Sequence, residues 1–283
     1  MKFMKKSIKA SVGKMPIIGR VILAMFRLKS PLRHHYVNLK DTIAWLLKSK
    51  EITNYTYDLQ DMNRRHLAAF VAHITGKSLD EITGYMDELA SDGELRSHIR
   101  ERTISSRENF VSDAEARYGR REGWYAIARA IKPSVIVETG VDKGLGACVL
   151  AAALIRNGEE GHAGRYYGTD INMEAGWLLS GKYARFGQIL IGDSIGSLKK
   201  LDEKIDLFIN DSWHTPEYEG GEYAAIRHKL SEDTVILGDN AHATDELMKF
   251  ACQTWRSFLF FQEKPKNHWY PGGGIGAAFR RKE

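Results

Sequence analysis

The sequence predicts an α/β fold in which a doubly wound, mainly parallel sheet of seven strands follows a helical N-terminal region. Two patterns predict this fold. From residue 41 to about residue 117, apolar residues recur every three or four positions, as on the buried face of a helix. After residue 131, short β-branched runs alternate with helical segments, which is typical of βαβ units. A chain of 283 residues, 43% of them hydrophobic, can bury such a core without disulfides or structural metals.

The helical region contains a recognisable helix start. Ser78 followed by Glu81 resembles a capping box, in which a serine side chain bonds to the backbone three residues later. The helix that begins there should direct Ile82, Met86 and Leu89 inward, because these residues are spaced by three and four positions. No catalytic constellation is recognised in this half of the chain.

Seven short apolar runs are the predicted strands of the sheet. They are residues 134–139, 166–170, 188–191, 205–210, 235–238, 258–261 and 274–280. The last two follow the fifth helix, so we expect an antiparallel edge on an otherwise parallel sheet. Ligands of such sheets bind at the carboxyl ends of the strands, near the point where the strand order reverses. The residues directly after each run are therefore the functional candidates.

Cysteine and hydrophobic content indicate a cytoplasmic protein. Cys148 and Cys252 are the two cysteines of the chain, and both lie in apolar helical contexts. We therefore expect two buried, reduced thiols. No run of about eighteen or more apolar residues occurs, so no segment is expected to span a membrane.

The positive charge of the chain is concentrated in a basic N-terminal arm, residues 1–40. The arm holds ten Lys and Arg residues and no acid, which leaves 31 basic and 36 acidic residues elsewhere. Arg20 interrupts the apolar stretch at residues 15–26, so a signal peptide fits poorly. Two interpretations stay open. The arm is either a basic amphipathic helix that contacts an anionic membrane or nucleic acid, or a peripheral helix with a solvated charged face.

A glycine-rich loop follows the first predicted strand. It reads Glu138-Thr-Gly140-Val-Asp-Lys-Gly144-Leu-Gly146 and precedes an apolar helix. Glycines there allow a tight turn and let a ligand approach the backbone at a helix N-terminus. Residues 139–146 also fit the pattern T-G-x-x-x-G-x-G of the NAD(P)-binding loop in short-chain dehydrogenases. Those enzymes also need a downstream Tyr-x-x-x-Lys pair. No Tyr after Gly146 has Lys four residues later, so the dehydrogenase interpretation is disfavoured.

S-adenosylmethionine (SAM) suits these strand ends better. A carboxylate at the end of the first run, Glu138, can reach the methionyl amino group. Asp170 ends the second run, where an acid accepts hydrogen bonds from both ribose hydroxyls. The third run is followed by Asp193 and Ser194, polar groups suited to adenine. Each residue taken singly is also explained by a capping or turn role. The predicted cofactor site comprises Glu138, Gly140, Gly144, Gly146, Asp170, Asp193 and Ser194.

A second polar group follows the fourth and fifth runs. Asp211 and His214 come after the fourth run, and Asp239 and Asn240 after the fifth. These strand ends should be neighbours on the cofactor side of the sheet. Two carboxylates and one amide carbonyl are hard oxygen ligands, which suit Mg²⁺ or a similar cation. Such a cation lowers the pKa of a bound hydroxyl and holds the developing oxyanion in line with the sulfonium methyl group. The Asp239–Asn240 pair is also compatible with a simple turn.

At these positions the sequence resembles class I SAM-dependent methyltransferases, in particular metal-dependent O-methyltransferases of the catechol and caffeoyl-CoA type. The resemblance covers roughly residues 119–280 and implies a Rossmann-like domain at residues 117–283. It implies that Asp211, Asp239 and Asn240 are metal ligands. Catechol enzymes place a lysine base three residues after the first ligand, where this chain has His214. A histidine base there is similar to O-methyltransferases that act on antibiotic sugars.

The sequence thus predicts a Mg-dependent O-methyltransferase with His214 as catalytic base and a small molecule or sugar as acceptor. The expected organisation is a basic arm at residues 1–40, a helical region at residues 41–116 and the methyltransferase domain at residues 117–283. One alternative is metal-independent methylation of nitrogen or nucleic acid, which is disfavoured because the Asn-Pro-Pro-aromatic motif associated with flipped bases is absent. Another is a SAM-binding partner protein without catalysis. The acceptor and the oligomeric state stay open.

Overall fold

The computed structural model describes residues 18–280. The chain divides into two compact units. One contains helix α2 (Ile18–Lys48) and the segment Asn267–Tyr270, and within it Trp45 packs edge-on against Trp269. The other contains Lys50–Lys266 and the chain from Pro271 onward. Among the described residues, no helix is both long and apolar enough to cross a bilayer.

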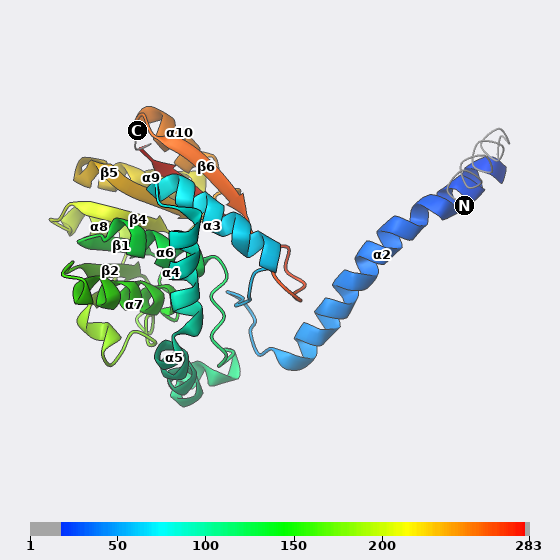
Figure 1. The fold of residues 1–283 in the computed structure, drawn as a ribbon, viewed down its shortest axis with the longest axis horizontal. Helices are drawn as coiled ribbons and strands as arrows, with labels where there is room; N and C mark the ends of the chain where they lie inside the picture. Colours follow the sequence, from blue (N-terminus) through cyan, green and yellow to red (C-terminus); the bar gives the residue numbers. More distant parts are fainter. Residues whose placement is uncertain (1–17, 281–283) are drawn as a thin grey trace. The chain divides into compact units, whose positions relative to one another are not determined.

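The second unit is built on a seven-stranded sheet with the strand order β3-β2-β1-β4-β5-β7-β6 (Figure 1). Its strands are β1 (Val135–Thr139), β2 (Arg165–Asp170), β3 (Gly187–Ile191), β4 (Ile205–Asn210), β5 (Leu230–Asp239), β6 (Ser257–Gln262) and β7 (Gly274–Phe279). The first five pair in parallel, and β7 runs antiparallel to both of its neighbours. This confirms the predicted doubly wound sheet. The antiparallel strand lies one position in from the edge, where β6 is found.

Helices cover the two faces of this sheet. The helices of this unit are α3 (Asp61–Thr75), α4 (Leu79–Ser91), α5 (Gly93–Ser105), α6 (Arg121–Ile131), α7 (Leu145–Glu159), α8 (Ser194–Lys200), α9 (Pro216–Ile226) and α10 (Glu246–Gln253), with short 3₁₀ turns at Arg107–Phe110, Tyr183–Arg185 and Arg227–Lys229. Alternate residues of β1 point to opposite faces. Val135 and Val137 share a core cluster with residues of α8, α9 and α10. Glu138 lies on the other face, against the first turn of α7 and Trp124 of α6. Because both faces are covered, every residue of β1 is buried.

The helical region follows the sequence prediction at α4. The Ser78 side chain accepts a hydrogen bond from the backbone N–H of Glu81 at 3.1 Å, and Ile82, Met86 and Leu89 are buried. Helix α2 continues through residue 40, and α3, α4 and α5 lie in the same compact unit as the sheet. The contacts within the chain therefore place a boundary near residue 49. The predicted division into an arm (residues 1–40), a helical region (41–116) and a methyltransferase domain (117–283) stays a prediction.

The two cysteines have different environments. Cys148 in α7 is fully buried, as expected, whereas Cys252 in α10 is exposed. The prediction of two buried thiols is wrong for Cys252. The face of α10 that packs on the sheet carries Leu247, Phe250 and Ala251. One further residue turns the chain by about 100°, so Cys252 points outward.

The strand register gathers the predicted site residues at one edge. Thr139 of β1 is paired with Thr169 of β2 on one side and with Asn210 of β4 on the other. Asn210 in turn pairs with Gly238 of β5. The residues that follow these positions therefore leave the sheet side by side at its carboxyl edge.

Candidate active site

The glycine loop between β1 and α7 depends on residues without side chains. Gly140 has a φ of 80°, and a Cβ there would lie 1.9 Å from the backbone oxygen of Asp211. Gly144 has a φ of 94° and precedes the first turn of α7. At Gly146 a Cβ would lie 2.5 Å from a carboxylate oxygen of Glu138. The loop thus packs directly against a neighbouring strand end and leaves the N-terminus of α7 at the carboxyl edge, where backbone N–H groups can bind an anionic group.

Asp170 lies at the end of β2, beside the glycine loop. One carboxylate oxygen accepts a hydrogen bond from the backbone N–H of Asp142 at 2.9 Å. The other accepts from the backbone N–H of Asn172 at 2.8 Å. These bonds hold the carboxylate in place, and each oxygen keeps a further lone pair for a hydroxyl group.

Glu138 lies beneath the loop. Its side chain is only 1% exposed and accepts a hydrogen bond of 2.7 Å from the Tyr166 hydroxyl. Burial raises the pKa of Glu138 to about 7. The described bond joins Glu138 to Tyr166 inside the protein, so contact with a methionyl amino group stays a prediction.

Asp193 and Ser194 begin helix α8. Asp193 accepts a hydrogen bond of 2.6 Å from the backbone N–H of Gly196, and another of 2.9 Å from the Tyr218 hydroxyl. Ser194 is almost fully buried and donates to Glu222. Asp193 therefore caps the helix and Ser194 binds the buried Glu222, and a role of either residue toward adenine stays a prediction.

Glu222 is a buried carboxylate that the sequence analysis did not single out. It is fully buried in α9, and burial raises its pKa. It connects the carboxyl ends of β1 and β4 with the start of α8. Its hydrogen-bond donors are the side chains of Thr139, Ser194, Asn210 and Ser212. The one signal in the sequence was an acid directly beside the apolar stretch at residues 223–226.

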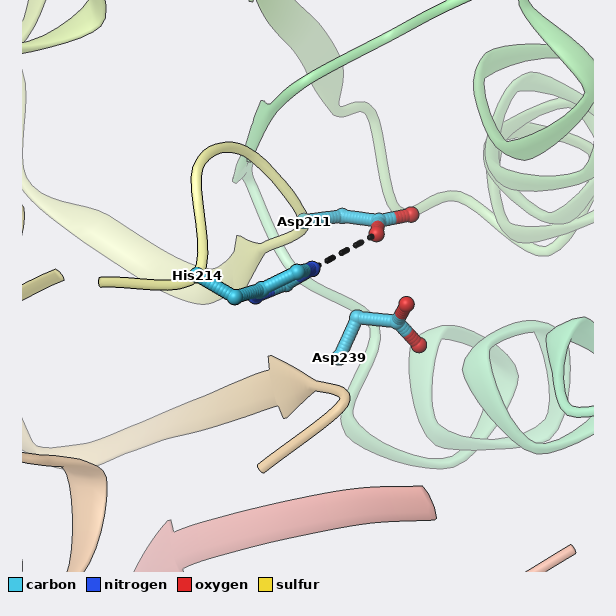
Figure 2. Close-up of side chains that lie close together, drawn as sticks. All are labelled: Asp211, His214 and Asp239. Atoms are coloured by element: carbon cyan, nitrogen blue, oxygen red, sulfur yellow. Dashed lines mark ion pairs between the residues drawn. The ribbon is translucent and has the colours of Figure 1, made fainter. Parts of the chain in front are cut away.

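Asp211, His214 and Asp239 lie together at the ends of β4 and β5 (Figure 2). One potential ligand atom from each lies within 4.8 Å of the others. The His214 Nε2 atom is 3.9 Å from Asp211 Oδ1. Burial and the nearby Asp239 carboxylate raise the pKa of Asp211. The structure therefore brings together three residues that lie up to 28 positions apart in the sequence.

The His214 ring is held by a second carboxylate. Its Nδ1 atom is 3.0 Å from Glu219 Oε1, and Glu219 is itself buried and accepts a hydrogen bond from Thr244. A carboxylate at Nδ1 favours the proton on that nitrogen, which makes Nε2 the proton-accepting nitrogen of the ring. Nε2 lies 3.3 Å from the Asn240 side-chain nitrogen. The Asn240 side chain, predicted as a metal ligand, therefore contacts the ring of the predicted base.

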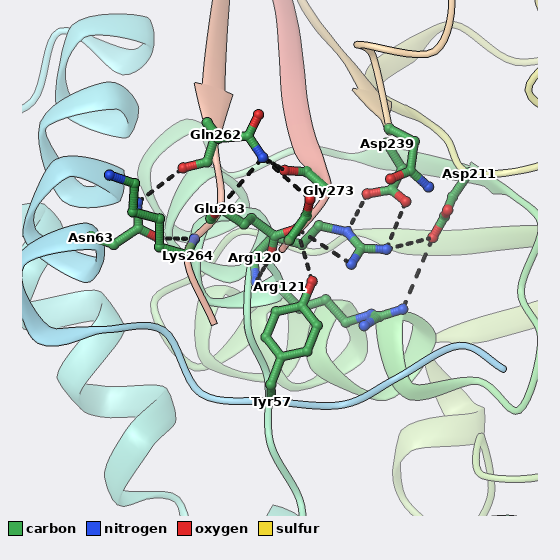
Figure 3. Close-up of polar contacts among 12 residues, drawn as sticks. Tyr57, Asn63, Arg120, Arg121, Asp211, Asp239, Gln262, Glu263, Lys264 and Gly273 are labelled. Carbon is green, nitrogen blue, oxygen red and sulfur yellow. Dashed lines mark hydrogen bonds and ion pairs between the residues drawn. The ribbon is translucent and has the colours of Figure 1, made fainter. Parts of the chain in front are cut away.

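Arg120 faces the same carboxylates and was missed by the sequence analysis (Figure 3). It donates to Asp239 Oδ2 at 2.7 Å and lies 3.7 Å from both Asp211 Oδ2 and Glu263 Oε2. Burial opposes its charged form, but these three carboxylates raise the pKa of Arg120 above its ordinary value. A signal existed in the sequence: Arg120 and Arg121 stand at the start of a helix, where the helix dipole disfavours positive charge.

The donor set suits a divalent cation in its chemistry. Asp211 and Asp239 supply hard carboxylate oxygens, and an imidazole nitrogen stands beside them. Arg120 already places positive charge at the same oxygens. The negative charge of Asp211 and Asp239 can thus be balanced by a bound cation or by the guanidinium group of Arg120.

Comparison with known proteins identifies this part of the chain. Residues 137–241 match the family model of a methyltransferase domain. This segment of the chain is therefore a methyltransferase domain. The matched segment runs from β1 to just beyond β5 and includes every predicted site residue, from Glu138 to Asn240. No curated protein matches the sequence.

Solved structures of methyltransferases align with this chain. TomG, an O-methyltransferase from Streptomyces achromogenes involved in tomaymycin synthesis and solved with SAM, aligns with a TM-score of 0.51 and 16% identity over 68% of this chain and 92% of its own. A methyltransferase from Geobacter sulfurreducens aligns with a TM-score of 0.47 and 17% identity over 72% of this chain and 96% of its own. A SAH-bound methyltransferase from Podospora anserina gives a TM-score of 0.43 and 15% identity over 82% and 100%. The likeness to TomG confirms the predicted fold class.

Proposed function

We propose that this methyltransferase domain transfers the methyl group of SAM to a hydroxyl group of a small molecule or sugar, with His214 as the base. One observation carries the proposal. The Nδ1 atom of His214 is held by buried Glu219 at 3.0 Å, while Nε2 lies 3.9 Å from Asp211 Oδ1 and 3.3 Å from the Asn240 side-chain nitrogen. This is the arrangement expected of a proton acceptor whose orientation and tautomer are set by the protein.

In this proposal SAM binds along the ends of β1, β2 and β3. The glycine loop at Gly140 and Gly144 lets the cofactor approach the backbone, and Asp170 accepts hydrogen bonds from the ribose. His214 follows β4, the strand that pairs with β1 on the other side. The proposed base and the proposed cofactor site thus belong to adjacent parts of one edge.

The chemistry is a direct displacement. The acceptor oxygen forms a bond to the methyl carbon while the carbon–sulfur bond breaks, and its electron pair stays on sulfur to give S-adenosylhomocysteine. His214 takes the hydroxyl proton, and Glu219 stabilises the imidazolium that results. A preorganised base of this kind contributes about a hundredfold to ten-thousandfold in rate.

We further propose Asp211, Asp239 and Asn240 as ligands of Mg²⁺ or a similar cation. A bound cation would lower the pKa of the acceptor hydroxyl. A metal-independent version has support of its own, because Arg120 lies against Asp239 and near Asp211 and could supply the positive charge itself. The two versions differ in whether removing divalent cations stops the reaction.

The cofactor is tested first, by titrating the purified protein with SAM in a calorimeter and using NAD as the control ligand. Saturable heat with SAM alone supports the proposed site. Heat with NAD alone, or no heat with SAM, would overturn it.

The base is tested with His214→Gln, following S-adenosylhomocysteine release with a panel of sugar and phenolic acceptors. Turnover should fall by about a hundredfold or more while the Kd for SAM stays within about twofold. His162→Gln, at an exposed position, is the matched control and should behave as wild type. Wild-type turnover by His214→Gln would remove His214 from the mechanism.

The metal is tested with Asp239→Ala and with chelator-treated protein. If a cation is required, Mn²⁺ binding followed by paramagnetic resonance should be lost in Asp239→Ala, and chelation should stop turnover of the wild type. Full turnover after chelation would instead support the version that relies on Arg120.

A further inference from the structure

Helix α2, labelled in Figure 1, carries an exposed apolar stripe. Its residues are separated by three or four positions, and each is between 49% and 70% exposed. They are Met25, Leu28, Leu32, Tyr36, Leu39, Ile43 and Leu46. At about 100° per residue, this spacing places all seven within about one third of the circumference of the helix.

The rest of its own unit leaves this stripe exposed. Within the unit, the helix contacts the segment Asn267–Tyr270 through Trp45, whose ring centroid lies 5.5 Å from that of Trp269 and 6.1 Å from that of His268. By helical position, Trp45 lies on the side of α2 away from the stripe. Large exposed apolar stripes on a helix normally mark a surface that binds a partner.

The charge of this part of the chain selects the kind of partner. Residues 1–40 contain ten Lys and Arg residues and no acid, and α2 itself contains one acid, Asp41. Two copies of such a helix, packed stripe to stripe, would bring like charges together. Pro31 also removes a backbone hydrogen bond from the middle of the helix, which disfavours a long regular coiled coil. An anionic lipid surface instead offers both negative charge and an apolar layer.

We propose that α2 lies in the interface of an anionic membrane, with the apolar stripe toward the acyl chains and the basic residues among the headgroups. No described helix meets the requirements for spanning, so α2 lies along the surface. This surface would hold the methyltransferase domain at the membrane. The proposal rests on α2 alone and is independent of the reaction proposed above.

The first test is flotation of the full-length protein with lipid vesicles. Vesicles of phosphatidylcholine with about one third phosphatidylglycerol should carry the protein upward, and pure phosphatidylcholine vesicles should not. Raising the salt concentration should weaken the binding, because headgroup attraction is screened. Equal binding to both vesicle types, or no binding to either, would overturn the proposal.

The second test separates the stripe from charge alone. Leu39→Glu places a carboxylate on the stripe, whereas Val37→Glu makes the same charge change two residues away, on another face of the helix. Both positions are exposed, at 57% and 50%, so neither change should disturb folding. We expect Leu39→Glu to weaken binding to anionic vesicles by about tenfold or more, and Val37→Glu by less than about threefold.

Three measurements accompany these variants. Both should bind SAM as the wild type does, which shows that the methyltransferase domain is intact. Equal losses of vesicle binding by the two variants would show that charge alone is responsible and overturn the role of the stripe. If Leu39→Glu instead converted a dimer to a monomer in sedimentation, and the wild type did not bind vesicles, the stripe would pair with a second copy of the chain.

Discussion

At the scale of single residues, the candidate site is a set of buried acids whose charge is controlled by their partners. Burial raises the pKa of Glu138, Glu222 and Asp211, because a carboxylate loses hydration inside the protein. Hydroxyl and amide donors surround Glu222, and the Tyr166 hydroxyl donates to Glu138. These donors favour the ionised forms, so they lower the pKa of each acid and act against the effect of burial. The net shift in pKa of each acid should therefore determine how the free energy of unfolding depends on pH.

Glu138→Gln tests this balance. In the folded protein the pKa of Glu138 is about 7, against an ordinary value of 4.5. The stabilising effect of the raised pKa is fully present below 4.5 and is lost as the pH rises through 7. Relative to Glu138→Gln, the wild type should therefore lose about 3 kcal/mol of unfolding free energy between about pH 5 and pH 8. Chemical denaturation across this range measures the difference, with the exposed Glu174→Gln as control, and a difference independent of pH would contradict it.

At the scale of elements, the glycine loop is where the sheet, a helix N-terminus and the proposed cofactor site meet. Gly140 has a backbone conformation that favours glycine and lies against the backbone of Asp211. The loop thereby ties the end of β1 to the end of β4, which is followed by the proposed base His214 and by Asp211, one of the proposed metal ligands. The shape of the proposed SAM site and the position of Asp211 are consequently coupled through backbone contact alone.

Gly140→Ala should disrupt this coupling. A Cβ at residue 140 would lie 1.9 Å from Asp211 O, so β1 and β4 must separate locally. We expect a loss of about 2–4 kcal/mol in unfolding free energy and at least about tenfold weaker SAM binding. Gly84→Ala in α4 is the control, because a Cβ there meets nothing within 4 Å. It should stabilise the protein by about 0.5–1 kcal/mol. Unchanged SAM binding by Gly140→Ala would mean that the loop is not part of the cofactor site.

At the scale of the whole molecule, the chain consists of a methyltransferase unit and a separate helical unit. The methyltransferase unit contains the sheet, α3–α5 and every residue proposed for catalysis. The helical unit contains α2, whose exposed apolar residues contribute nothing to the core of the sheet. Folding and SAM binding should therefore depend on the methyltransferase unit, and vesicle binding on the helical unit.

Deleting residues 1–48 tests this separation. The truncated protein should keep a Kd for SAM within about twofold of the wild type, and its Tm should change by no more than a few degrees, because the buried core is retained. It should no longer float with anionic vesicles. Calorimetry, thermal melting and flotation measure the three quantities, and an aggregated protein or lost SAM binding would show that α2 belongs to the fold of the methyltransferase domain.

Part of the candidate site could be predicted, because local sequence patterns indicate the order and type of the secondary-structure elements. The β-branched runs between helices predict parallel strands, and parallel strands leave Asp170, Asp211 and Asp239 at one edge. The methyltransferase match confirms the class that these positions indicated. Their roles toward SAM, metal and acceptor stay predictions.

The remaining features depend on contacts between distant parts of the chain. Arg120 meets Asp239 across 119 positions, and Glu222 joins side chains from β1, β4 and α8. The insertion of β7 between β5 and β6, and the outward position of Cys252, are likewise decided by packing. Local spacing determined the elements and their order, because helices and strands bury one face at a fixed period. Which buried charges face each other was decided only by the tertiary structure, because pairing in a low-dielectric interior depends on distance in space rather than in sequence.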